Sequence, residues 1–147
     1  MTPRDYLDQI ARPSIEDFRH HPTSIRHAWT AAAALFHFRD WLAKDRGAEP
    51  SVVQAEFEVG FPQFRAIADI ANASKHFKLD HSGPRKGLST QHFRAGRGAA
   101  FSDGTYYSDG STHSDAPDVI RMEFSGERID VLNLCRQAFT FLQTKAP

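Results

Sequence analysis

The residue types that could perform chemistry gather in one short segment of the chain. Five polar residues would share one face of an α-helix: Arg65, Asp69, Asn72, Lys75 and His76. Four of them fall within roughly 60° of one another around the helix axis, and Lys75 lies just beside them. An imidazole titrates near neutral pH, so His76 is a candidate general base or acid. The lysine and the arginine would bind a phosphate or stabilise its developing negative charge.

This set of side chains is typical of RNA phosphodiester cleavage. A base would activate the ribose 2′-hydroxyl, and a cation would stabilise the phosphorane. We therefore predict four catalytic residues: Asp69, Asn72, Lys75 and His76. Arg65 would bind substrate, together with Arg94 and Arg97 from a basic segment that also holds His92 and Phe93 and could contact RNA by charge and stacking.

A structural role fits the same residues. Arg65 and Asp69 have the spacing of an ordinary ion pair within a helix. Asn72 and His76 have the same spacing, which suits a hydrogen bond on the helix surface. A cation near the end of a helix also complements its dipole. The alternative hypothesis is therefore a non-catalytic interaction or structural module, in which this face joins the helices to the segment that follows it.

Caps and apolar periodicity predict the helices that position this segment. Thr2 and Ser14 begin two short helices, which Pro13 separates, and Gly47 ends the longest one. That long helix is apolar on most sides, with a narrow polar strip that includes His37 and Asp40, so it belongs at the centre of a bundle. The expected ranges are 3–11, 14–20, 23–46, 51–59 and 62–78.

The composition changes after the predicted site helix. Residues 79–118 form an insertion rich in Gly, Ser and Asp, 119–127 predict a strand and a turn, and 129–144 predict a closing amphipathic helix. We therefore expect a mainly α fold in one domain, 1–147. It would be a four- to five-helix bundle with a small β-hairpin or loop insertion before the last helix.

A short repeat lies inside the insertion at a period of six residues: Ser102-Asp-Gly104, Ser108-Asp-Gly110 and Ser114-Asp-Ala116. Calcium loops place oxygen ligands at closer spacing and add a distal Glu. A flexible or hairpin-like connector is therefore favoured over a calcium site.

The composition limits which partners the protein is expected to bind and which cellular compartment it is expected to occupy. Lys plus Arg and Asp plus Glu both number 18, so the net charge is zero and nonspecific DNA binding is not expected. Cys135 is the only cysteine and lies among apolar residues, which predicts a core position and a reducing, cytoplasmic setting. The eight histidines lack the spacing of metal ligands on a helix, so we expect neither a metal nor a cofactor. The chain has no long apolar run, so no membrane association is expected.

The pattern Asp69-x-x-Asn72-x-x-Lys75-His76 resembles a motif of small uncharacterised bacterial and phage proteins. The helical part is also similar to the HEPN superfamily, whose motif is an Arg, a polar residue, three residues and a His. Asn72-Ala-Ser-Lys-His76 matches the polar position and the His, whereas Ala71 stands where that family has its catalytic Arg. The resemblance implies a homodimeric helical bundle that binds or cleaves RNA, as a toxin or in phage–host conflict.

Overall fold

The computed structural model describes the chain except for residues 77, 81, 107 and 109–116. The described residues form a mainly helical fold with a small antiparallel sheet before the last helix, as the sequence predicts. The helices are α1 (Pro3–Tyr6), a π-helical turn (Leu7–Ala11), α2 (Arg12–His20), α3 (Ile25–Arg46), α4 (Pro50–Gly60), α5 (Phe64–Ala73) and α6 (Val131–Gln143).

The first helices form one continuous rod, so the prediction that Pro13 separates two helices is wrong. Thr2 begins the rod with the expected capping box, since its hydroxyl accepts from the Asp5 N–H at 3.1 Å. The π-helical turn then shifts the hydrogen-bond register. Pro13 consequently occupies one of the first two positions of α2, where its missing N–H costs little.

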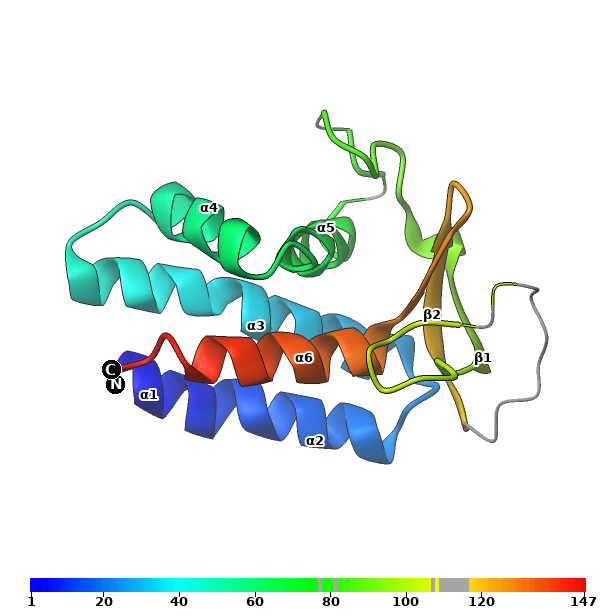
Figure 1. Cartoon of the computed structure of the whole chain (residues 1–147), viewed down its shortest axis with the longest axis horizontal. Helices are drawn as coiled ribbons and strands as arrows, with labels where there is room; N and C mark the ends of the chain where they lie inside the picture. Colours follow the sequence, from blue (N-terminus) through cyan, green and yellow to red (C-terminus); the bar gives the residue numbers. More distant parts are fainter. Residues whose placement is uncertain (77, 81, 107, 109–116) are drawn as a thin grey trace.

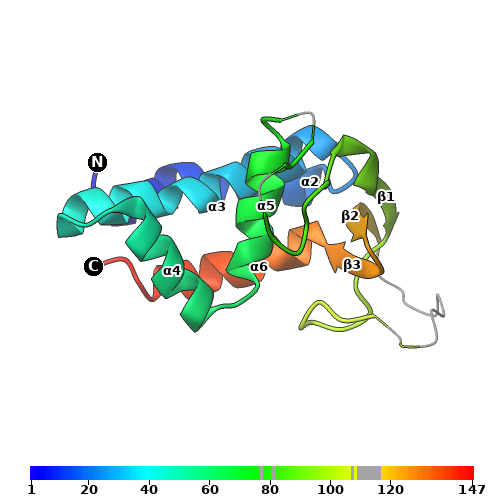
Figure 2. The same cartoon turned by 90° about the horizontal axis from the view of Figure 1, so that it is seen from above.

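The long helix α3 is central, as its apolar surface predicts. In Figure 1 it runs alongside α6, with α4 and α5 on one side and α1 and α2 on the other. Figure 2 shows α5 crossing over α3 at a steep angle. Ser24 caps the start of α3, and Gly47 ends it in the left-handed region, at a φ of 62°.

Aromatic rings fill the core between the helices. The Phe57 ring packs on Phe38 of α3 and Phe64 of α5, with ring centroids 6.1 and 5.1 Å apart, and all three side chains are buried. Cys135 is buried in α6, as predicted. Burial raises the pKa of its thiol well above the usual range, so it supplies no reactive thiolate.

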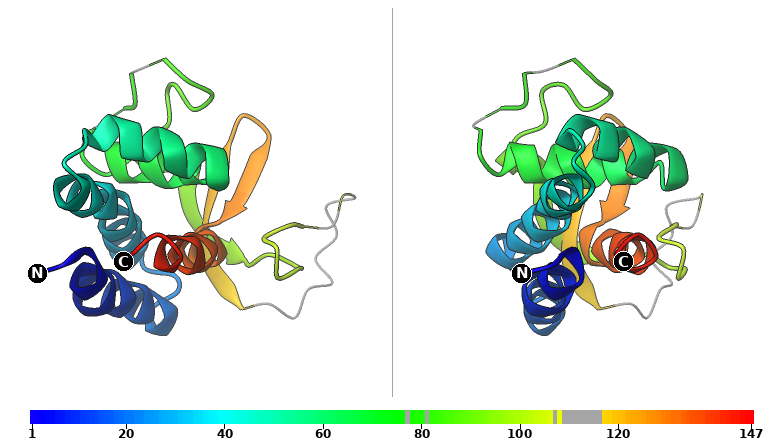
Figure 3. Two further views of the ribbon diagram at one scale, coloured as in Figure 1. Left: turned by 60° about the vertical axis from the view of Figure 1, so that its left-hand side comes forward. Right: turned by 90° about the vertical axis from the view of Figure 1, so that its left-hand side faces the viewer.

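The sheet packs at one end of the bundle (Figure 1), and it stands behind the helices when the bundle is viewed from its other end (Figure 3, right). Its strands are β1 (Phe93–Arg97), β2 (Asp118–Phe124) and β3 (Glu127–Asp130), in the order β1-β2-β3. The strand near 119 is confirmed, but β3 lies where the sequence predicts a turn and the start of a helix. Ser125 and Gly126 both have positive φ, which is the two-residue turn that joins twisted antiparallel strands.

Only the first copy of the six-residue repeat is fully described. The Asp103 carboxylate accepts hydrogen bonds from the N–H and the hydroxyl of Thr105, at 2.9 and 2.7 Å. This is a local turn, typical of a connector. Most of the second and third copies, with Asp109 and Asp115, lies outside the described residues.

No helix among the described residues has both the length and the apolar character needed to cross a membrane.

Candidate functional site

The helix that carries the predicted site is shorter than the sequence indicates, and this divides the polar face. We expected a helix over 62–78, but α5 ends at Ala73. Arg65, Asp69 and Asn72 lie on α5, whereas Lys75 and His76 follow its end and are exposed. The five residues therefore do not form one continuous site.

Asp69 is buried between two arginines. Its carboxylate accepts from Arg65 Nε at 3.3 Å and from Arg85 Nη1 at 3.0 Å, and the residue is 1% exposed. Burial by itself would lower the pKa of Arg85, but hydrogen bonds to Glu127 and Asp69 outweigh burial and raise it. A substrate reaches this carboxylate only if the ion-pair network opens.

The same network joins α5 to the insertion. Arg85, in the segment before β1, donates to Glu127 of β3 through two nitrogens, at 2.9 and 2.6 Å. A Cβ atom at Gly83 would lie 2.8 Å from a guanidinium nitrogen of Arg65, so the insertion also packs closely on that side chain. Two of the predicted site residues, Arg65 and Asp69, thus hold the insertion against the bundle.

Beyond the end of α5, Lys75 contacts a different helix. Its ammonium lies 3.1 Å from Nε2 of His37, and Nδ1 of His37 lies 2.8 Å from the carboxylate of Asp40. His37 and Asp40 are about 40% exposed, at 39% and 41%. The sequence indicates the polar strip of α3 but not this contact, because Lys75 and His37 are 38 residues apart.

A shallow depression of about 370 Å³ continues from this contact along α3. Its lining comes from one face of α3 and the end of α5: Ile25, Arg26, Trp29, Thr30, Ala33 and Ser74. Because Ser74 precedes Lys75, the depression and the Lys75–His37 contact adjoin. We call this region the α3–α5 surface, defined by Arg26, Trp29, Thr30, His37 and Lys75.

The two predicted arginines on β1 do not act together. Arg94 and Arg97 are both exposed, but three residues along a strand place them on opposite faces of the sheet. Arg94 is next to Phe93, whose ring meets the edge of Trp29 at a centroid distance of 5.9 Å. Because successive side chains of a strand alternate between its faces, Arg94 points away from the Phe93 and Trp29 rings, and Arg97 lies on the same face of the sheet as Phe93.

The histidine His27 lies near the start of α3, where it contacts other polar side chains. Its ring stacks on His21 with centroids 4.5 Å apart, and its Nε2 accepts from Arg26 at 3.0 Å. Desolvation, followed by the nearby positive charge of Arg26 and by His21, lowers the pKa of His27, and Asp17 opposes this shift. Among the described residues, no group of three His, Cys, Asp or Glu is placed to hold a metal ion.

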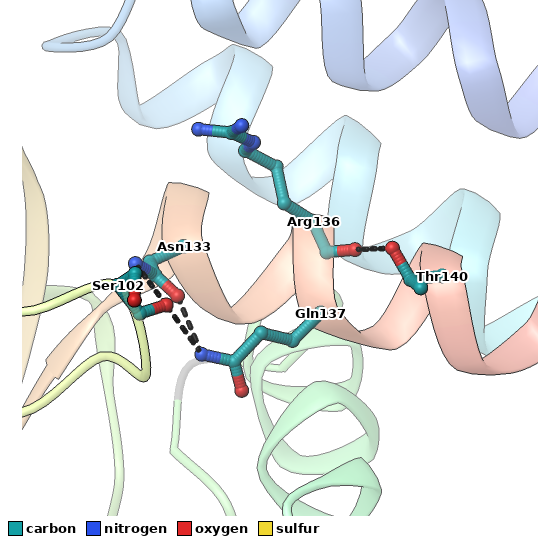
Figure 4. Close-up of a pocket in the computed structure, with 5 residues that line it drawn as sticks. All are labelled: Ser102, Asn133, Arg136, Gln137 and Thr140. Carbon is teal, nitrogen blue, oxygen red and sulfur yellow. Dashed lines mark hydrogen bonds between the residues drawn. The ribbon is translucent and has the colours of Figure 1, made fainter.

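A second depression lies on α6, and it is a poorer candidate. Figure 4 shows the side chains of Asn133 and Gln137 bonded to each other and to the Ser102 carbonyl, and the Thr140 hydroxyl bonded to the Arg136 carbonyl. Gln137 donates to Asn133 at 2.6 Å, and both amides donate to that carbonyl. These hydrogen bonds hold the loop after β1 against α6, so the polar groups of this depression already have partners within the protein.

Comparisons with protein-family models, curated proteins and solved structures find no match to this chain. The resemblance to the HEPN superfamily stays a prediction, and the functional argument rests on the geometry of the described residues.

Proposed function

We propose that this protein binds single-stranded RNA on the α3–α5 surface. The observation that carries the proposal is the position of Lys75, which places an exposed cation beside a depression that contains a half-buried tryptophan. Proteins that bind single strands combine backbone-tracking cations with aromatic rings on which bases stack.

The charge around the depression favours a nucleic-acid strand over an apolar ligand. Arg26 lines the depression and is exposed, and the exposed Lys75 directly follows Ser74 of its lining. Arg26 and Lys75 would contact phosphates of the strand, while Trp29 would stack a base. Since the chain has no net charge, binding depends on this local set of cations.

Fluorescence anisotropy with a short labelled single-stranded RNA tests the proposal. We expect binding by the wild type and a loss of about fivefold in affinity for Lys75→Ala, which corresponds to roughly 1 kcal/mol. Arg4→Ala is the matched control, because it removes one exposed cation from α1, on the other side of the bundle. Equal affinities of the two variants would contradict the proposal.

The non-catalytic structural module is a second candidate, supported by the buried network. Asp69 joins α5 to Arg85, and Arg85 joins the insertion to β3. Two of the five residues on the predicted polar face, Arg65 and Asp69, therefore have a structural role. Absence of RNA binding by a folded wild type would favour this candidate. The α3–α5 surface would then have no role in RNA recognition.

A further inference from the structure

We propose that His37 is the general base of an RNA-cleaving site on the α3–α5 surface, an inference that rests on the proposed RNA binding. Three side chains form a relay between α3 and the segment that follows α5: Asp40, His37 and Lys75. The carboxylate lies 2.8 Å from Nδ1, and the ammonium lies 3.1 Å from Nε2 of the same imidazole. A base held by an orienting group on its far nitrogen is the arrangement that activates hydroxyl nucleophiles.

The relay assigns the protons of the imidazole. A carboxylate only accepts hydrogen bonds and an ammonium only donates them. Nδ1 of His37 therefore carries the hydrogen and donates it to Asp40, while Nε2 presents a lone pair toward Lys75. A general base requires this lone pair.

Asp40 is itself held in place. Arg39 donates to its second carboxylate oxygen at 3.3 Å and also bonds Gln54 of α4. The Arg39 guanidinium lies 3.8 Å from the centroid of the Phe36 ring, which limits its movement. Asp40 is therefore a positioning residue that keeps the His37 ring in one orientation.

His76, the histidine predicted from the motif, lacks comparable support. It follows the end of α5 and is exposed, and within the described part of the chain no carboxylate is within ion-pair distance of it. His37 is better oriented for proton transfer, because each of its ring nitrogens has a fixed partner.

The reaction balances without an added reagent. Lys75 moves from Nε2 to a non-bridging phosphate oxygen, and Nε2 takes the proton of the ribose 2′-hydroxyl. The 2′-oxygen forms a bond to phosphorus as the bond from phosphorus to the 5′-oxygen breaks. The departing oxygen takes a proton from water, and the hydroxide produced takes the proton from His37. The products are a 2′,3′-cyclic phosphate and a 5′-hydroxyl.

The test uses the full chain and one labelled RNA beside its 2′-O-methyl counterpart. We expect both to bind and only the unmodified RNA to be cut, leaving a 2′,3′-cyclic phosphate. His37→Gln should lower the cleavage rate by about a hundredfold or more without changing affinity. His20→Gln, which removes an exposed histidine of α2, should cleave like the wild type.

Further variants separate chemistry from folding. Asp40→Asn should lower kcat with little change in KM, and Asp40→Glu should restore part of the rate, neither of which a general loss of structure would produce. Circular dichroism should show wild-type folding for each variant. RNA bound but not cut by the wild type, or cut normally by His37→Gln, would overturn this inference and leave the proposed RNA binding intact. Absence of binding would overturn both.

Discussion

At Asp69, a carboxylate is held out of water between two guanidinium groups. Removing it would leave the nearly buried charge of Arg85 with Glu127 alone. We expect Asp69→Ala to lower the free energy of unfolding by about 3 kcal/mol, as for other broken buried pairs. Urea unfolding followed by circular dichroism measures this loss.

Lys75→Ala provides the control for that measurement. Lys75 is exposed, so its loss should change the free energy of unfolding by less than about 0.5 kcal/mol. Similar losses in the two variants would contradict the division of the predicted face into a structural part and an accessible part.

Among the elements, α5 shows why the predicted site divides. No Gly or Pro occurs from 74 to 78, so the local sequence does not mark the end of the helix. Leu79 is buried and its backbone exchanges hydrogen bonds with Gly87 and Leu88. This packing requires the chain to leave the helix before Leu79, and it places Lys75 over α3.

The start of α6 depends on Asp130. One of its oxygens caps the helix by accepting from the Asn133 N–H at 2.8 Å, and the other accepts from Ala99 N–H at 2.8 Å. We expect Asp130→Ala to lower the free energy of unfolding by about 2 kcal/mol, since it removes a cap and a link to the insertion. Thermal unfolding of this variant beside Asp103→Ala, which removes only a local turn contact, measures the effect. Equal melting temperatures would contradict it.

For the molecule as a whole, acid should reduce stability partly through His27. Desolvation and the neighbours Arg26 and His21 lower its pKa below the ordinary 6.5, although Asp17 opposes them. The unfolded chain then binds a proton at higher pH than the folded chain does. The stability that the neutral ring contributes is therefore present above pH 6.5 and is lost as the pH falls below it.

His27→Gln should flatten this dependence. We expect the variant to lose less stability than the wild type when the pH falls from about 7 to about 5. Urea unfolding of both proteins at several pH values is the measurement. If the free energies of unfolding of the two proteins change equally with pH, His27 does not contribute to the pH dependence of stability.

Salt should weaken the proposed RNA binding only moderately. Contacts from Arg26 and Lys75 would release about two counterions, so the logarithm of the affinity should fall with a slope of about −1.4 against the logarithm of the salt concentration. Anisotropy titrations at several salt concentrations measure it. A slope near zero would exclude phosphate contacts as the source of affinity.

The sequence by itself determined the helical class, the central α3, the strand near 119 and the helix ends at Thr2 and Gly47. These features depend on periodicity and on hydrogen bonds between near neighbours, both of which the sequence contains. The candidate site was only partly predictable. Its polar face and the strip of α3 were visible as patterns, but the partners of each side chain were not.

Only the tertiary structure decided which polar groups meet. Arg85 reaches Asp69 from 16 residues away and Glu127 from 42, and Lys75 reaches His37 from 38. Such contacts depend on how helices and insertion pack, and no local propensity encodes them. The end of α5 also depends on tertiary packing, because Leu79 is buried against the segment near Leu88. This packing separates the buried Asp69 from the exposed Lys75.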